Sequence, residues 1–292
     1  MIHEDKEQFF TLIDRVASLT GFYAPLVEKD YYLTILLSRI HELSENLIFK
    51  GGTCLNKIYY TYYRLSEDLD FSMLLPQYKA TRGERRKCIQ PIKDKVEEFV
   101  KQFGMKIDKT SNPGRNESKQ YVYYLVYDSV TMLSEQTVKL EIGLRFNTIM
   151  ATEKRQVRHK FKHSFTDEPL IDGGEVQCMS LNEIVSEKLR AAALRRTIAP
   201  RDFYDLDFIV RNGFDLANTE VAELFKKKIE EDGGDADLKK YRVNLGRSDV
   251  EIKDMLTRIE KELFDVLTPD EQKNFELNTA LKRINKAMKV VI

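Results

Sequence analysis

The chain has 292 residues, of which 42% are hydrophobic and 32% are charged. A chain of this length and apolar content can bury a large core, which excludes a mainly disordered protein. The 47 Lys and Arg residues balance the 47 Asp and Glu residues, which excludes a protein that acts as one uniformly basic surface but leaves local charged patches open.

Helical and strand patterns alternate in the first part of the chain. Apolar residues at helical spacing predict helices over residues 6–20 and 28–43, and a short apolar run predicts a strand over residues 47–49. Thr53 is expected to cap the next helix. From residue 68 onward apolar residues alternate with polar ones, which predicts a half-buried strand.

A helix is predicted over residues 84–103, and two strands follow it. The segments 121–130 and 137–147 both alternate and are separated by a short turn, so they are expected to form an antiparallel hairpin. The pair Gly173 and Gly174 marks the expected domain boundary, because the patterns beyond it are helical.

The remainder of the chain is predicted to be helical. Ser180 and Glu183 form a capping box at the start of a helix that Pro200 ends. A second helix follows, and two more come after a Gly-Gly loop. Strands early and helices late predict an α+β fold, with one domain over residues 1–172 and a mainly helical domain over residues 173–292.

Cysteine spacing and hydropathy exclude further classes. Three widely spaced cysteines without a CxxC pair argue against a disulfide framework and against a structural zinc site. The N-terminal residues are charged, and no apolar run reaches the roughly 18 residues that a membrane span needs. We therefore expect a cytoplasmic protein without a membrane partner.

Acidic side chains mark two of the predicted strands. Asp68 and Asp70 leave the same strand face roughly 7 Å apart, because each residue advances about 3.3 Å. Carboxylates this close can hold one or two Mg²⁺ ions that bridge a triphosphate. Glu141 lies on the polar face of the second strand, between apolar neighbours. A solvated strand face would give the same pattern.

A glycine turn precedes these acids. Gly51 and Gly52 end a strand, and the backbone amides of such a turn and of the following helix favour phosphate, although any tight turn can use two glycines. The order of glycine turn, Asp-x-Asp and strand-borne Glu over about residues 47–147 resembles the DNA polymerase β-like nucleotidyltransferase superfamily. This resemblance implies a mixed sheet flanked by helices, a triphosphate on the turn and metal ions on the three acids.

Short motifs carry a more specific resemblance. The segments Phe49–Thr53 and Arg64–Asp70, the latter of the form R-x-S-x-D-x-D, are similar to motifs of the AbiEii toxin family. Its downstream E-K-L and R-D-x-x-D-L elements resemble Glu187–Leu189 and Arg201–Leu206, and Glu28–Tyr32 matches an N-terminal family segment. The order is preserved, and roughly the last eighty residues carry no recognisable motif.

Members of this family are nucleotidyltransferase-like toxins of type IV toxin–antitoxin (abortive infection) systems, and some transfer nucleotides onto tRNA. The resemblance implies an NTP as substrate, RNA such as the 3′ end of tRNA as acceptor, and a cognate antitoxin as a possible partner. Two Mg²⁺ ions would be held by Asp68, Asp70 and Glu141. The triphosphate would be held by Gly51, Gly52, Thr53 and Ser66, although Ser66 could equally bind a loop amide.

Two further residues come from the downstream motifs. Lys188 lies in the apolar stripe of a predicted helix, so its charge must reach solvent, pair with an acid or bind an anion. The resemblance implies a phosphate contact. Asp202 and Asp205 share a face of the next helix and could pair with Lys188, Arg195 or Arg201. We assign the catalytic role to Asp205 and helix capping to Asp202.

Two segments are basic in spite of the neutral total. Residues 79–115 contain eleven Lys and Arg against five Asp and Glu, and residues 154–162 contain five basic residues and no acid. Such segments bind polyanions, although they also form ordinary solvated faces. The residues predicted to contact nucleic acid are Arg85, Arg86, Lys87, Arg155 and Arg158.

Two other functions stay open at this point. An enzyme of the same fold could transfer the nucleotide to a small molecule, which the basic segments disfavour. A nucleotide-binding or partner-binding protein without turnover would have no need of all three acids.

Overall fold

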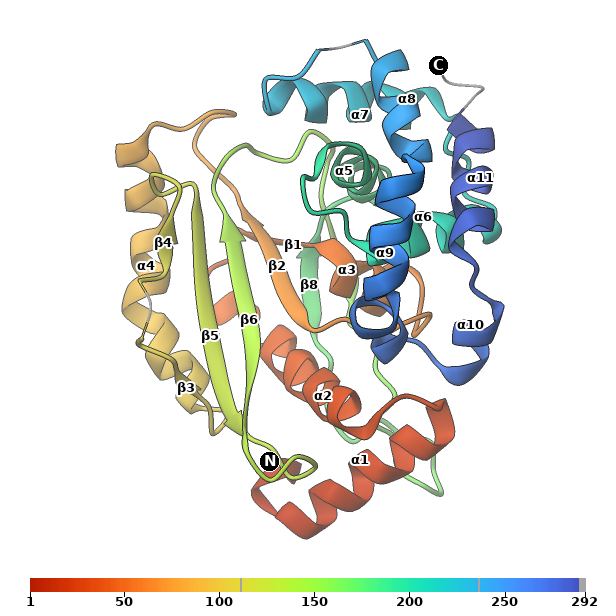
Figure 1. Cartoon of the computed structure of the whole chain (residues 1–292). Helices are drawn as coiled ribbons and strands as arrows, with labels where there is room; N and C mark the ends of the chain where they lie inside the picture. The colour runs from red at the N-terminus through yellow and green to blue at the C-terminus, as the bar shows by residue number, and fades with distance from the viewer. Residues whose placement is uncertain (111, 236, 289–292) are drawn as a thin grey trace. The chain divides into compact units, whose positions relative to one another are not determined.

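The structure is a computed structural model that describes residues 1–110, 112–235 and 237–288. The chain forms two compact units, one over Met1–Met179 and one from Ser180 onward (Figure 1). The first contains the strands and the second is helical, as an α+β fold requires. No helix among the described residues is long and apolar enough to cross a membrane.

The first unit combines a sheet with four α-helices and short helical turns among its described residues. The predicted helices over residues 6–20 and 84–103 are confirmed within two residues at each end. The elements are η1 (Ile2–Glu4), α1 (Lys6–Thr20), α2 (Ala24–Ser38), η2 (Ile40–Glu42), β1 (Leu47–Lys50), α3 (Gly51–Cys54), η3 (Leu55–Tyr59), β2 (Asp68–Met73), α4 (Arg82–Lys101), β3 (Lys106–Ile107), β4 (Gly114–Arg115), β5 (Gln120–Asp128), β6 (Glu135–Gly143), β7 (Glu153–Gln156) and β8 (Glu175–Cys178).

Eight strands of the described residues form one mixed sheet in the order β3-β5-β6-β2-β1-β8-β7, with β4 paired to β5. β2 is antiparallel to β1 and parallel to β6, and β1 is parallel to β8. The long β5–β6 hairpin beside β2 (Figure 1) confirms the predicted antiparallel pair. β8 follows Gly174 in sequence but pairs with β1, and it therefore belongs to the first unit.

Strand alternation separates an apolar from a polar face. Leu69, Phe71 and Met73 of β2 are buried, whereas Asp68 and Asp70 are half-buried on the other face. The same alternation in β6 gives one buried apolar face and one that carries polar side chains. α2 contacts β6 and β8. It therefore covers part of the sheet and helps to bury its apolar side chains.

Buried charges of α2 fix its neighbours. Glu28 is fully buried and accepts hydrogen bonds from the Ser129 hydroxyl (2.7 Å) and the Val130 amide (2.8 Å), which lie in the turn between β5 and β6. Asp30 pairs with the buried Lys57 ammonium at 2.7 Å. The acidic residues of the segment Glu28–Tyr32 are therefore structural in this fold, because a buried charge without a partner would be strongly destabilising.

Two details of the first unit differ from the sequence predictions. Thr53 does not cap a helix: α3 begins at Gly51, and the buried Thr53 hydroxyl donates to the carbonyl oxygen of Asp68. The short strands β3, β4, β7 and β8 were not predicted, because two to four residues are too few to show a period.

The second unit contains helices only among its described residues. The prediction of two helices after the Gly-Gly loop is wrong, because α8, α9, α10 and α11 all follow it. The elements are α5 (Leu181–Leu194), α6 (Pro200–Arg211), α7 (Thr219–Glu231), α8 (Lys239–Gly246), α9 (Asp249–Glu262), η4 (Phe264–Val266), α10 (Pro269–Asn274) and α11 (Leu277–Met288).

Ser180 caps α5 as predicted, since its hydroxyl accepts from the Glu183 amide at 3.3 Å. The Glu183 carboxylate is fully buried and pairs with Lys228 of α7 at 2.8 Å. The Ser180 half of the predicted capping box is therefore confirmed, whereas the Glu183 carboxylate joins two helices through its pair with Lys228.

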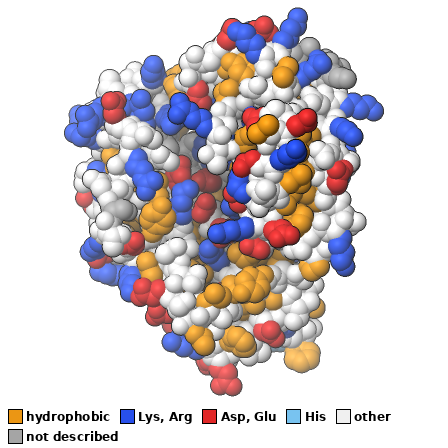
Figure 2. All heavy atoms as spheres, in the orientation of Figure 1, with side chains coloured by type: hydrophobic (Ala, Val, Ile, Leu, Met, Phe, Trp, Pro, Cys, Tyr) orange, Lys and Arg blue, Asp and Glu red, His pale blue; other side chains and the backbone are white. Residues whose placement is uncertain are grey.

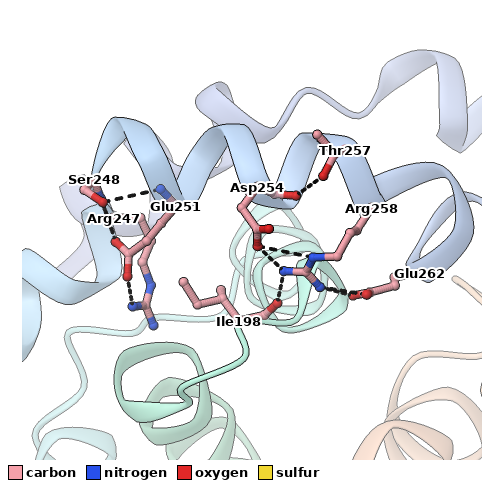
Figure 3. A network of polar contacts seen from close by, with 8 residues as sticks. All are labelled: Ile198, Arg247, Ser248, Glu251, Asp254, Thr257, Arg258 and Glu262. Atoms are coloured by element: carbon pink, nitrogen blue, oxygen red, sulfur yellow. Dashed lines mark hydrogen bonds and ion pairs between the residues drawn. The ribbon is translucent and has the colours of Figure 1, made fainter.

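Arg258 connects α9 to the segment between α5 and α6 within the second unit (Figure 3). Arg258 donates to the carbonyl oxygen of Ile198, which lies between α5 and α6, at 2.8 Å, and pairs with Asp254 and Glu262 of its own helix at 2.7 and 2.6 Å. Ser248 and Glu251 form a full capping box at the start of α9. Part of the C-terminal segment without motifs therefore serves to hold α5 and α6 in place.

Candidate active site

The three predicted acids meet on the polar face of the sheet. In the parallel pair of β2 and β6, Asp70 lies opposite Glu141, and Asp68 lies opposite Lys139. In the antiparallel pair of β1 and β2, Asp70 lies opposite Lys50. Residues opposite each other on neighbouring strands share a face. The register therefore gathers three carboxylates and two lysines at the centre of the sheet.

Lys139 bridges two of these acids. Its ammonium lies 3.0 Å from Glu141 Oε2 and 3.6 Å from Asp68 Oδ2. The amide of Gln120, on β5, donates to Glu141 Oε1 at 2.6 Å. Burial alone would raise the pKa of Glu141, but the hydrogen bond and charge of Lys139 and the bond from Gln120 outweigh it and lower that pKa. Glu141 is therefore ionised and fixed at both oxygens.

The environment of Asp70 disfavours the ionised form of its carboxyl group. Burial, together with the negative charges of Glu141 and Asp68, raises its pKa to about 6, although Lys139 and Lys50 act in the opposite direction. A carboxylate whose charged form is disfavoured in this way is characteristic of a site that accepts a further positive charge.

The raised pKa of Asp70 makes stability depend on pH. Between its ordinary value of 3.8 and its folded value of about 6, the folded chain keeps a proton that the unfolded chain has lost. The free energy of unfolding should therefore fall by up to about 3 kcal/mol as pH rises through this range. We expect Asp70→Asn to be more stable than wild type near pH 8 and equal to it below pH 4. Urea denaturation in EDTA measures both values, and lower stability of the variant near pH 8 would contradict the electrostatic account.

The glycine turn lies directly against the acids. Gly51 has a φ of +78°, and a Cβ added there would lie 2.5 Å from Asp70 Oδ2. A Cβ on Gly52 would lie 2.6 Å from Arg64 Nη2 and 3.2 Å from Ser66 Oγ. Both positions therefore exclude side chains, and the turn brings bare backbone next to Asp70 and Ser66.

We expect Gly51→Ala to lower the free energy of unfolding by about 1–2 kcal/mol, because alanine is strained at positive φ, and to displace the Asp70 carboxylate. Gly83→Ala is the matched control, since the nearest atom to its added Cβ is 4.0 Å away and alanine favours the helix by about 0.5–1 kcal/mol. Urea denaturation of the two variants tests this, and equal midpoints would mean that the turn does not require glycine.

Thr53 and Ser66, which were also predicted to hold the triphosphate, differ in burial and in the contacts of their hydroxyl groups. Thr53 is 1% exposed, and its hydroxyl already donates to the carbonyl oxygen of Asp68, so this hydroxyl could reach a ligand only after rearrangement. Ser66 is half-buried with its hydroxyl near Gly52. Gly51, Gly52 and Ser66 are thus brought together with the acids of β2.

Lys188 forms a buried charge cluster within the second unit. Its ammonium lies 2.9 Å from Asp202 Oδ1 and 2.5 Å from Asp205 Oδ2, and Asp202 also pairs with Arg195 at 2.9 Å. Of the alternatives left open for Lys188, the structure shows the pairing with acids, and the phosphate contact stays a prediction. The assignment of Asp202 as a helix cap is wrong, because Ala199 occupies the N-cap position of α6 and the Asp202 carboxylate binds the two cations.

Arg85 is unavailable for nucleic acid. It is buried, and its guanidinium donates to the carbonyl oxygens of Ala80 (2.5 Å) and Glu117 (3.2 Å). Arg86 and Lys87 are exposed on α4. Of the three neighbouring basic residues, one is therefore structural and two are accessible.

The two arginines of the second basic segment contact neighbouring side chains. Arg155 lies over the ring of Tyr59, 5.1 Å from its centroid, and pairs with Glu153 at 2.7 Å. Arg158 donates to the Thr61 hydroxyl at 2.8 Å. These contacts reduce the charge that the segment offers to a polyanion.

The carboxylates suit magnesium by their chemistry, because Mg²⁺ prefers hard oxygen ligands. They already attract a cation, since the Lys139 ammonium lies within reach of Asp68 and Glu141. Within the described ranges no group of three or more Asp, Glu, His or Cys side chains is arranged to enclose a metal ion. A metal ion bound by all three acids would therefore have to displace Lys139.

Comparisons with known proteins identify a family and a fold. The sequence model of a family described as nucleotidyl transferase AbiEii toxin, type IV toxin–antitoxin system, matches residues 35–286. The fold resembles that of MenT4, a nucleotidyltransferase toxin of Mycobacterium tuberculosis, with 18% identity, a TM-score of 0.58, and 97% of this chain and 98% of that chain covered. It also resembles a nucleotidyltransferase of Helicobacter pylori, with 17% identity, a TM-score of 0.53, and 92% and 96% covered. No curated protein matches the chain.

Proposed function

Since the chain belongs to the family of AbiEii nucleotidyltransferase toxins of type IV toxin–antitoxin systems, we propose that it transfers the nucleotide of an NTP to RNA at the 3′ end of tRNA. The reaction would depend on Mg²⁺, and the partner implied by the family is a cognate antitoxin. The observation that carries the proposal is the register that sets Asp70 beside Glu141, next to a turn in which Gly51 touches Asp70.

Asp68, Asp70 and Glu141 would hold the metal. Bound there, Mg²⁺ would stabilise the negative charge that develops on the phosphates of the NTP. The Gly51–Gly52 turn brings bare backbone close to these acids, and the amides of such a turn favour the oxygens of a phosphate. The Ser66 hydroxyl, near Gly52, can donate to one of those oxygens.

Glu141 is the residue best prepared to orient the acceptor hydroxyl. Gln120 fixes one of its oxygens, and Lys139 contacts the other. Its lowered pKa keeps the carboxylate ionised near neutral pH. Glu141 therefore can accept a hydrogen bond from the hydroxyl, and then its proton, without first losing one of its own.

Lys188 is assigned to the phosphates through the family motif E-K-L. The buried carboxylates of Asp202 and Asp205 fix its ammonium in one position. A preorganised positive charge stabilises developing negative charge without a reorganisation cost. Asp205 would act on the reaction by positioning Lys188.

The proposal is tested with each of the four NTPs, labelled at the α-phosphate, and total RNA in Mg²⁺ or in EDTA. We expect label in a tRNA-sized band with Mg²⁺ and none with EDTA. A parallel reaction in which a small-molecule extract replaces RNA should give no labelled product. Label confined to small molecules would favour the small-molecule enzyme, and no label in either mixture would favour a protein without turnover.

A further inference from the structure

A cavity of about 480 Å³ lies in the first unit, between one face of α4 and the loop that carries β4. We call it the α4 cavity and define it by four basic lining residues, Arg82, Arg86, Lys93 and Arg115. Figure 2 shows Lys and Arg side chains gathered on the side of the molecule that carries α4 and β4. Glu117 also lines the cavity, which with four cations and one acid is positively charged, although the chain as a whole is neutral.

Ion pairs within the described part of the chain do not neutralise the four cations of the α4 cavity. The four cations are exposed, and within residues 1–110, 112–235 and 237–288 none of them forms an ion pair. Only Lys93 has a described partner, the ring of Tyr121, 4.9 Å from its centroid. Like charges held together repel one another, so an anion in the cavity would be stabilised by all four.

The spread of the cations favours a polymer. Arg82, Arg86 and Lys93 follow one face of α4, and the rise of 1.5 Å per residue separates the first from the last by about 16 Å. This spread suits successive phosphates of a polynucleotide better than it suits a single phosphate group. Arg115 extends the row onto the opposite wall.

The wall opposite α4 is a strained loop. Asn116, Glu117 and Ser118 have φ values of 49°, 55° and 65°, a left-handed conformation that is strained for Glu117 and Ser118 and that asparagine adopts more readily. The buried Arg85 holds this loop through the Glu117 carbonyl oxygen. Strained backbone that is held in place is often found where a ligand binds.

One side chain connects this loop with the acids. The Asn116 amide donates to Gln120 Oε1 at 3.2 Å, and the Gln120 amide donates to Glu141 Oε1 at 2.6 Å. The loop that lines the α4 cavity is therefore joined to Glu141 by two successive side-chain hydrogen bonds.

We propose that the α4 cavity binds the phosphate backbone of the RNA acceptor, with Arg82, Arg86, Lys93 and Arg115 as the phosphate contacts. This inference rests on the proposed function, because it assumes that the acceptor is a polynucleotide. It assigns RNA binding to one face of α4 and leaves out Lys95 and Lys101, which are exposed on the same helix but do not line the cavity.

The test compares two double charge reversals, Arg86→Glu with Lys93→Glu in the cavity and Lys95→Glu with Lys101→Glu outside it. Binding of total tRNA is measured over a range of salt concentrations, and transfer of α-labelled nucleotide to RNA is measured with the same preparations. We expect the cavity variant to bind tRNA at least about tenfold more weakly, with a salt slope reduced by about 1 per lost contact. The control variant should resemble wild type, and both should keep wild-type thermal stability.

Other results of these assays would show whether the cavity assignment alone is wrong or the proposed function as well. Equal weakening of both variants would overturn the cavity as a site and indicate unspecific attraction. Inorganic triphosphate is added as a competitor at the same phosphate concentration as the tRNA. If it displaces tRNA from wild type, the cavity is a site for free phosphates, and the proposal is overturned. Transfer to RNA by wild type with normal transfer by the cavity variant would overturn only the cavity assignment. No transfer and no tRNA binding by wild type would overturn the proposed function as well.

Discussion

The variants Asp68→Asn and Asp70→Asn are each expected to transfer nucleotide about 10³-fold more slowly than wild type, by the magnitude typical of removing one preorganised electrostatic group. Both changes keep the shape of the side chain but remove the negative charge that holds a cation. For Asp70 the loss should coincide with higher stability near pH 8, because the charge that serves the reaction disfavours the folded state. A substitution that lowers the rate of transfer and raises the free energy of unfolding is typical of residues at functional sites.

Asp128→Asn is the matched control for these variants. Asp128 ends β5 opposite Glu135, at the far end of the hairpin from Gln120, and it is exposed. The rate of transfer by this control should equal that of wild type in the same assay. A rate for Asp70→Asn within tenfold of the control would show that the acids of β2 are not required, and would remove the basis of the proposed mechanism.

Lys188→Ala is expected to destabilise the second unit by about 3–5 kcal/mol, because it removes the ammonium that pairs with the fully buried Asp205 carboxylate. This variant would lose activity for a structural reason alone. Lys188→Arg should regain part of the stability but little activity, because a planar fork replaces a point charge. Thermal unfolding of the three proteins measures the structural effect.

A double variant separates the chemical role of Lys188 from the structural one. Lys188→Met with Asp205→Asn removes both buried charges, and Asp202 keeps its pair with Arg195. We expect this protein to fold with most of the wild-type stability and to lose about 2–4 kcal/mol of transition-state stabilisation, a 30-fold to 1000-fold lower rate. Wild-type transfer by the folded double variant would mean that Lys188 only holds α5 to α6.

The carboxylates could be predicted from the sequence because they depend on local alternation. Asp68 and Asp70 differ by two residues, and a strand of period two places both on one face whatever its neighbours are. The pairing of Asp70 with Glu141 depends on the register between β2 and β6, which local patterns do not contain. The resemblance to a family supplied that relation, and Lys139 and Gln120 were missed because their contacts follow from the same register.

Arg85 shows a signal that was present in the sequence and not used. It shares the spacing of Ile89, Ile92 and Val96, which are buried on α4, so the helical period places it on the apolar stripe and not on the basic face. The cavity residues Arg82, Arg86 and Lys93 lie on a neighbouring face of α4, beside this stripe. Their partner Arg115 could not be predicted, because it depends on how the loop with β4 returns to the helix.

The central claim is that the acids of β2 and β6 support the transfer of a nucleotide, and it is tested most directly by the position of the label that reaches RNA. Wild-type protein is incubated with total RNA, Mg²⁺ and an NTP labelled at either the α- or the γ-phosphate, beside the Asp70→Asn variant. Nucleotide transfer predicts label in RNA from the α-phosphate only, pyrophosphate as the labelled product from the γ-phosphate, and neither with the variant. Label in RNA from the γ-phosphate, or undiminished transfer by Asp70→Asn, would contradict the account.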